Sequence, residues 1–199
     1  MGNKLPADFY LRTNTIAVAR SLIGKLLVIP DEVGRRVSGM IVETEAYLGP
    51  DDRAAHSYGG RRTARNEVMY GPGGHVYVFF VYGMYYQFNV VAGPADRPHA
   101  ILIRSLEPVE GIEQMRLRRG PMKDRNLTSG PGKLSIAMGI DRSLNGAELN
   151  GDRVWIEEYK RVRRAEIAAG KRIGIDYAGS DAENAWRFWL SGNPFVSRP

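Results

Sequence analysis

A long run of β-branched and aromatic residues at positions 75–93, HVYVFFVYGMYYQFNVVAG, constrains the fold more than any other segment. Valine, tyrosine and phenylalanine favour extended strands, and Gly83 lies between the two halves of the run. The segment is therefore predicted to form a β-hairpin that turns at Gly83. Together with the other short strands and few helices of the chain, it points to a mainly antiparallel sheet.

Shorter segments predict the remaining elements. Strands are expected at 25–29, 37–47, 100–106 and 154–159, with a final strand in WRFWL. Helices are expected after Thr13 or Asn14, over Glu107 to Arg119, and after Ser129 or Gly130, where Pro131 lies in the first turn. Without repeats or long linkers, residues 1–199 are predicted to form one α+β domain, with a curved, open-barrel-like sheet flanked by helices and a protruding hairpin.

Composition excludes several kinds of site. The chain has no cysteine, so disulfides, thiolate catalysis and cysteine-ligated metals are excluded. The three histidines, at positions 56, 75 and 99, lack the spacing of a metal-binding motif. The net charge of +6 favours attraction to polyanions, although a solvated basic surface would give the same balance.

No apolar run approaches the roughly 20 residues that cross a bilayer, and the first residues contain no apolar signal segment. The sequence is therefore expected to be that of a cytoplasmic protein without a membrane partner.

Paired carboxylates in the segment VETEAYLGPDDRAAHS give the first candidate site. Alternation along a strand places Glu43, Glu45 and Tyr47 on one face, and His56 follows the next turn. Glu45 is a candidate general base or stabiliser of positive charge. The alternative is that both glutamates form structural salt bridges with arginines.

The predicted hairpin tip, VYGMYY, carries large side chains where turns usually carry small or polar ones. The tip is either buried or suited to insertion between stacked bases. Along one arm, His75, Tyr77 and Phe79 share a face. If this face meets Tyr47 and His56, the rings form a slot for a flat, cationic base. The alternative is that these rings are ordinary core residues.

Six segments together resemble the 3-methyladenine (alkyladenine) DNA glycosylase family, of the type without a helix-hairpin-helix motif. They are MIVETEAYLGPDDRAAHS, GGRRTARN, VYVFFVYGMYYQFNVV, ILIRSLEPVEG, DRNLTSGPGKL and RIGIDYAG with the later WRFWLSGNPFVS. They follow the family order and span roughly residues 7–197. The resemblance implies a monofunctional bacterial enzyme of base excision repair that acts on double-stranded DNA as a monomer.

Such an enzyme flips an alkylated or deaminated purine out of the duplex and hydrolyses its N-glycosidic bond with an activated water. The product is an abasic site, and no metal or organic cofactor is needed. The resemblance implies that Glu45 activates the water, while Arg104 and the carbonyl of Ile175 hold it. A buried Arg104 also needs an ionic partner, and Glu45 is the expected one.

The resemblance also implies base-binding and DNA-binding positions. The side chains of Tyr47, His56 and Phe79 would enclose the base. Main-chain groups of Ala54 and His56 would contact the edge of the base. Asn89 would exclude guanine by its exocyclic amine. The DNA-binding positions would be Tyr82, Met84, Tyr85, Lys133, Arg172 and Gly174, with Tyr82 filling the gap in the duplex. Phe79 replaces a tyrosine of better-known members, which keeps stacking but loses a hydroxyl.

Two other classes of protein fit parts of the pattern. A non-enzymatic nucleic-acid binder would explain the charge and the aromatic residues, but it would leave Glu45 without a role. A metal-dependent phosphohydrolase would use Glu45, Asp51 and His56.

Overall fold

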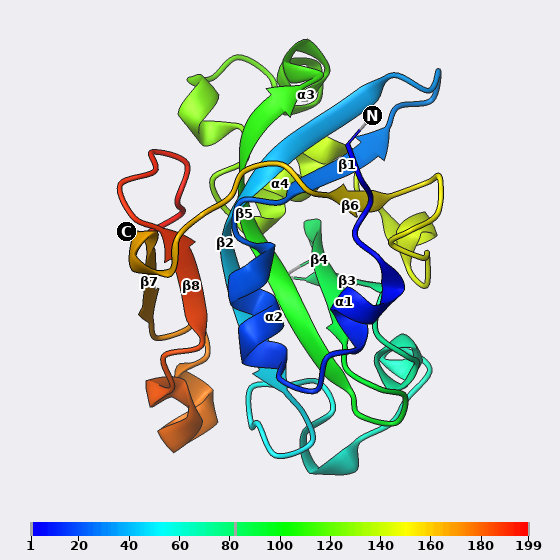
Figure 1. Cartoon of the computed structure of the whole chain (residues 1–199), viewed down its shortest axis with the longest axis vertical. Helices are drawn as coiled ribbons and strands as arrows, with labels where there is room; N and C mark the ends of the chain where they lie inside the picture. Colours follow the sequence, from blue (N-terminus) through cyan, green and yellow to red (C-terminus); the bar gives the residue numbers. More distant parts are fainter. Residues whose placement is uncertain (1, 82, 199) are drawn as a thin grey trace.

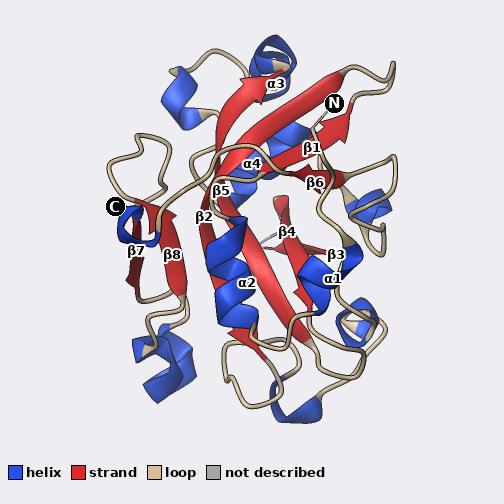
Figure 2. Cartoon of the chain, in the orientation of Figure 1, coloured by secondary structure: helices blue, strands red, loops and turns tan. Residues whose placement is uncertain are grey.

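The computed structural model describes residues 2–81 and 83–198. The helices are α1 (Ala7–Leu11), α2 (Thr15–Leu22), α3 (Ile112–Arg119) and α4 (Pro131–Met138). The strands are β1 (Leu26–Pro30), β2 (Arg36–Leu48), β3 (Val76–Val81), β4 (Tyr85–Ala92), β5 (His99–Glu110), β6 (Trp155–Glu157), β7 (Ile167–Gly170) and β8 (Arg187–Leu190). Short 3-10 helices lie at Tyr58–Gly60, Glu67–Tyr70, Asp124–Asn126, Arg142–Leu144, Arg164–Glu166 and Asp176–Glu183. Figures 1 and 2 show the strands at the centre and the helices around them.

The strands form one open antiparallel sheet. Its main path runs β3-β4-β5-β2-β1-β6, and β8 pairs with both β2 and β7. One edge of β2 is shared, because β1 pairs with Arg36–Met40 and β8 pairs with Glu43–Glu45. Irregular register between β2 and β5 around Glu43 marks a bulge, which bends the long central strands. The predicted α+β fold with an open, mainly antiparallel sheet is confirmed.

Helix α2 covers one face of the two central strands (Figure 1). The Asn14 side chain caps its first turn by accepting a hydrogen bond from the Ala17 amide at 3.0 Å, as one of the two predicted caps required. On the facing strand, the Thr44 hydroxyl donates to the Ala19 carbonyl at 3.0 Å. Because strand residues alternate, Glu43 and Glu45 on either side of Thr44 point to the opposite face of the sheet.

The predicted hairpin is confirmed as β3 and β4, which pair in register from Val76 with Val90 to Val81 with Tyr85. Gly83 has a φ of +66°, a conformation that a residue with a side chain adopts only under strain. Met84 in the turn is 69% exposed, so the tip lies at the surface rather than in the core. Tyr82, the predicted wedge, lies outside the described residues.

The helix predicted over Glu107 to Arg119 is wrong in its first part. Residues 107–110 continue β5 and pair with Ser38–Met40, and α3 begins only at Ile112, after Gly111 with a φ of +69°. Pro108 therefore lies in a strand, at a register irregularity where its missing N–H is tolerated. The extended pairing with β2 outweighs the local helix signal.

Two short elements, α1 and β7, were not predicted from the sequence. Strand β7 lies in the basic stretch after residue 160 and exists through its pairing with β8. In the described part of the chain, no helix combines the length and the apolar character needed to span a membrane.

Candidate active site

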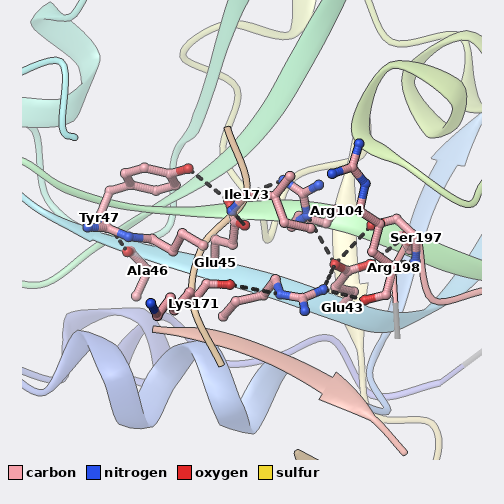
Figure 3. Close-up of polar contacts among 12 residues, drawn as sticks. Glu43, Glu45, Ala46, Tyr47, Arg104, Lys171, Ile173, Ser197 and Arg198 are labelled. Atoms are coloured by element: carbon pink, nitrogen blue, oxygen red, sulfur yellow. Dashed lines mark hydrogen bonds and ion pairs between the residues drawn. The ribbon is translucent and has the colours of Figure 1, made fainter. Parts of the chain in front are cut away.

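Glu45 lies near the end of β2, and its side chain is completely buried. The Tyr47 hydroxyl donates to its Oε2 at 2.8 Å, and the Ile173 amide donates to its Oε1 at 2.8 Å. Arg104 on β5 places Nη1 3.2 Å from Oε2 (Figure 3). The predicted ion pair between Arg104 and Glu45 is therefore present.

An aromatic pocket lies directly beside this carboxylate. Its lining includes Tyr47, His56, Tyr77, Phe79, Arg104 and Ile173. Glu45 does not line the pocket itself, but its three partners, Tyr47, Arg104 and Ile173, all do. The carboxylate thus lies immediately behind the pocket wall. All five residues predicted to contact a base, namely Tyr47, Ala54, His56, Phe79 and Asn89, line this pocket.

Cross-strand pairing explains how the rings converge. Tyr77 pairs with Asn89 and Phe79 pairs with Gln87, so four side chains of the hairpin share one face. The His56 ring meets this face, with its centroid 4.5 Å from that of Phe79. His75 was expected on the same slot, but its Nδ1 instead lies 2.9 Å from the Pro72 carbonyl, and His75 does not line the pocket.

The protonation states of the site follow from burial. Burial raises the pKa of Glu45 above its ordinary value, against the opposing effect of the Arg104 charge. Burial, followed by the nearby Glu45 charge, raises the pKa of Tyr47 far above its ordinary value, so its hydroxyl stays protonated and donates. A carboxylate with a raised pKa is suited to take up a proton at neutral pH.

Burial lowers the pKa of His56 to about 4, and the charges of Arg65 and Arg61 add to the effect. His56 is therefore neutral at pH 7, and its Nδ1 lies 2.9 Å from the Tyr77 hydroxyl. A neutral ring beside the pocket does not repel a cationic base.

An NMR titration of the folded protein is expected to give a midpoint of about 4 for His56. The unfolded chain binds this proton near pH 6.5, so the contribution of His56 to stability is full above that pH and declines as the pH falls towards 4. A midpoint near 6.5 in the folded protein would contradict the buried environment. The same resonance in denaturant provides the reference.

Arg172, a predicted DNA-binding residue, has a buried side chain and not an exposed one. It is buried and forms an ion pair with Asp52, with Nη1–Oδ2 at 2.5 Å and Nη2–Oδ1 at 2.9 Å. Its guanidinium lies between the rings of Tyr47 and Trp186, at 4.8 and 4.9 Å from their centroids. This pairing anchors the segment whose next residue, Ile173, donates to Glu45.

Several main-chain groups predicted to contact a base or a water are already engaged. The Ala54 amide donates to Asp52 at 3.0 Å, and the His56 carbonyl accepts from Asn66 at 3.1 Å. The Ile175 carbonyl accepts from the Ala178 amide at 2.8 Å. Ile173, which sequence reasoning missed, is the residue of this segment that contacts Glu45. Its contact is through the backbone, so no side-chain pattern could have revealed it.

The predicted DNA-binding residues other than Arg172 and Tyr82 lie around the pocket and the hairpin. Met84 is exposed at the tip, and the Tyr85 ring packs closely against Gly132 of α4. Lys133 on α4 is exposed, and Gly174 lines the pocket. Tyr177, which was not predicted, lines the same pocket and is 74% exposed.

Acidic and histidine side chains do not gather into a metal site in residues 2–81 and 83–198. No group of three or more of them is close enough to hold a metal ion there. The phosphohydrolase alternative, with Glu45, Asp51 and His56 around a metal, thus has no geometric support among the described residues.

Comparison with known proteins gives the family. Residues 8–194 match the model of the methylpurine-DNA glycosylase (MPG) family. A relative from Bacillus cereus (strain G9842), named "Putative 3-methyladenine DNA glycosylase", is 50% identical over 97% of this chain and 98% of its own. A relative of the same name from Clostridium acetobutylicum is 51% identical over 98% of this chain and 97% of its own. The chain therefore belongs to the methylpurine-DNA glycosylase family, hydrolases that act on N-glycosyl bonds of DNA in base excision repair.

Proposed function

We propose that the protein flips alkylated purines out of duplex DNA into the aromatic pocket and hydrolyses their N-glycosidic bond with a water activated by Glu45. The single observation that carries this proposal is the buried Glu45 carboxylate, held by three groups that all line one aromatic pocket. Stacking against Tyr47, His56 and Phe79 suits a flat, positively charged base.

In the proposed reaction, the bond between the sugar C1′ and the purine nitrogen breaks, and its electron pair leaves with the base. A cationic alkylated base departs as a neutral molecule. Negative charge on Glu45 stabilises the positive charge that develops on the sugar, and this stabilisation is largest in the transition state. The water oxygen bonds to C1′, and Glu45 takes up the water proton.

We propose that deaminated purines such as hypoxanthine are also substrates, excised more slowly because a neutral base is a poorer leaving group. The protein is proposed to act on DNA as a monomer in the bacterial cytoplasm. Met84, exposed at the hairpin tip, is proposed to enter the duplex beside Tyr82, where a wedge restores part of the stacking lost on flipping.

Release of free base from methylated duplex DNA in the presence of EDTA tests this function. We expect 3-methyladenine in the soluble fraction and an abasic site in an unbroken strand, with EDTA having no effect. Binding without release would favour the non-enzymatic binder. Strand cleavage that EDTA abolishes would favour the phosphohydrolase.

A further inference from the structure

Glu43, two residues before Glu45, is buried and accepts hydrogen bonds from several donors (Figure 3). Its Oε1 accepts from Arg104 Nε at 3.1 Å, from Arg187 Nη1 at 3.0 Å and from the Ser197 hydroxyl at 3.0 Å. Its Oε2 accepts from the Ser105 hydroxyl at 3.0 Å and from the Ser197 amide at 2.8 Å. This carboxylate is therefore a fixed anchor and not a free reactant.

Arg104 connects this anchor to the proposed catalytic carboxylate. Its Nε is bonded to Glu43, and its Nη1 pairs with Glu45 at 3.2 Å. Because the guanidinium is planar and rigid, fixing Nε also fixes the direction of Nη1. The position of Arg104 at the pocket wall thus depends on where Glu43 is held.

Strand β8 and the segment after it hold Glu43. Ser197 donates to Glu43 twice, and Arg187 Nη1 reaches both Glu43 and the Arg198 carbonyl, the latter at 2.6 Å. Arg187 Nε also donates to the Lys171 carbonyl at 3.1 Å, two residues before the amide that contacts Glu45. The same cluster therefore supports both the arginine and the backbone beside Glu45.

We propose that Glu43 and Ser197 are positioning residues for the glycosylase reaction: Ser197 holds Glu43, and Glu43 holds Arg104 against Glu45. This inference rests on the proposed role of Glu45 as the base. The Arg187 charge and the two Ser197 donors stabilise the charge of Glu43, which leaves part of the Arg104 charge for Glu45 and for a group bound in the pocket.

The proposal predicts how the acidic limb of the pH–rate profile moves, because that limb reports ionisation of the base. The groups around Glu45 are Glu43 and Tyr47 from β2, Arg104 from β5, the Ile173 amide, and Arg172 beyond the Tyr47 ring. Glu43→Gln removes a like charge but keeps an oxygen that accepts from Arg104 Nε, so Arg104 stays in place and its charge acts on Glu45. Both effects favour the ionised form, so the limb should move to lower pH by about one unit.

Ser197→Ala is expected to move the limb the other way. Without the Ser197 hydroxyl, Glu43 interacts more strongly with Arg104. The ion pair between Arg104 and Glu45 is then weaker. Ionisation of Glu45 then requires a higher pH, by a fraction of a unit. Ser197→Thr keeps the hydroxyl and is expected to restore the wild-type profile.

The experiment is a single-turnover measurement of base release from methylated duplex DNA between pH 5 and 9. It compares wild type, Glu43→Gln, Ser197→Ala and Ser197→Thr, with Ser191→Ala as a control at an exposed serine in the same part of the chain. Opposite shifts for Glu43→Gln and Ser197→Ala, with recovery in Ser197→Thr and no change in Ser191→Ala, support the proposal. Lower rates with an unmoved acidic limb overturn it, because a purely structural role would give that result.

Thermal unfolding of each variant is measured alongside. Where Glu43→Gln does not fold, the comparison of Ser197→Ala with Ser197→Thr decides the proposal by itself. Failure of the proposed function is separable, because it would appear as a near wild-type rate in a Glu45→Gln variant. An inactive Glu45→Gln variant together with an unmoved limb overturns only the positioning roles.

Discussion

Replacing Glu45 with glutamine is expected to lower the rate of base release by about 10³-fold or more, while binding to lesion-containing DNA stays within a few-fold of wild type. The amide keeps the size of the carboxylate but carries no negative charge and cannot take up the proton of a water. It also offers one acceptor oxygen where Tyr47 and Ile173 each donate to a separate carboxylate oxygen. The loss therefore falls on the transition state more than on the bound ground state.

Single-turnover excision separates the chemical step, and fluorescence anisotropy with a labelled lesion duplex measures binding. Glu113→Gln is a matched control, because this glutamate lies on α3 with a side chain that is 81% exposed. We expect the control to match wild type in both measurements. A Glu45→Gln variant that excises at close to the wild-type rate would remove Glu45 from the mechanism.

Replacing Asp52 with alanine is expected to lower the free energy of unfolding by about 3–5 kcal/mol, the usual effect of leaving one partner of a buried ion pair uncompensated. Arg172 would lose both of its bonds to Asp52, and its side chain is completely buried. The amides of Leu48 and Ala54, which donate to Asp52 at 3.0 Å each, would lose their acceptor as well. The melting temperature should fall by roughly 10 °C.

Asp152→Ala serves as the control for this measurement. Asp152 also pairs with a cation, Lys4, at 3.1 Å, but its side chain is fully exposed. Exposed pairs of this kind contribute less than about 1 kcal/mol. Denaturant unfolding measures the free energy of unfolding of both variants. Equal decreases in the two would show that the buried Asp52–Arg172 pair stabilises the fold no more than an exposed pair does.

The parts of the fold predicted from the sequence are those specified by local chemistry. The hairpin follows from its β-branched and aromatic residues around Gly83, and α2 begins where Asn14 can cap it. The helix predicted at residues 107–110 is absent because Pro108, although suited to a helix start, pairs with Gly39 of β2. Pairing with β2 is a long-range effect that no local pattern carries.

The site also combines features that local sequence predicts with features that depend on long-range contacts. Period-two spacing brought Glu43, Glu45 and Tyr47 to one face, and the pair between Arg104 and Glu45 followed from the need to neutralise a buried charge. The resemblance implied a DNA-binding role for Arg172, and only the fold shows its side chain buried and paired with Asp52. The contact of the Ile173 amide could not be predicted from the sequence, because every residue except proline has a backbone N–H group.

The order in which the chain is made has a consequence for when the site can exist. Glu43 and Glu45 emerge early from the ribosome, yet their partners include Ile173, Arg187 and Ser197, which come more than a hundred residues later. A nascent chain that has reached only β5 contains Glu43, Glu45 and Arg104 without these later partners. Synthesis must therefore pass residue 197 before the surroundings of both carboxylates are complete. Incomplete chains are expected to lack glycosylase activity for this reason.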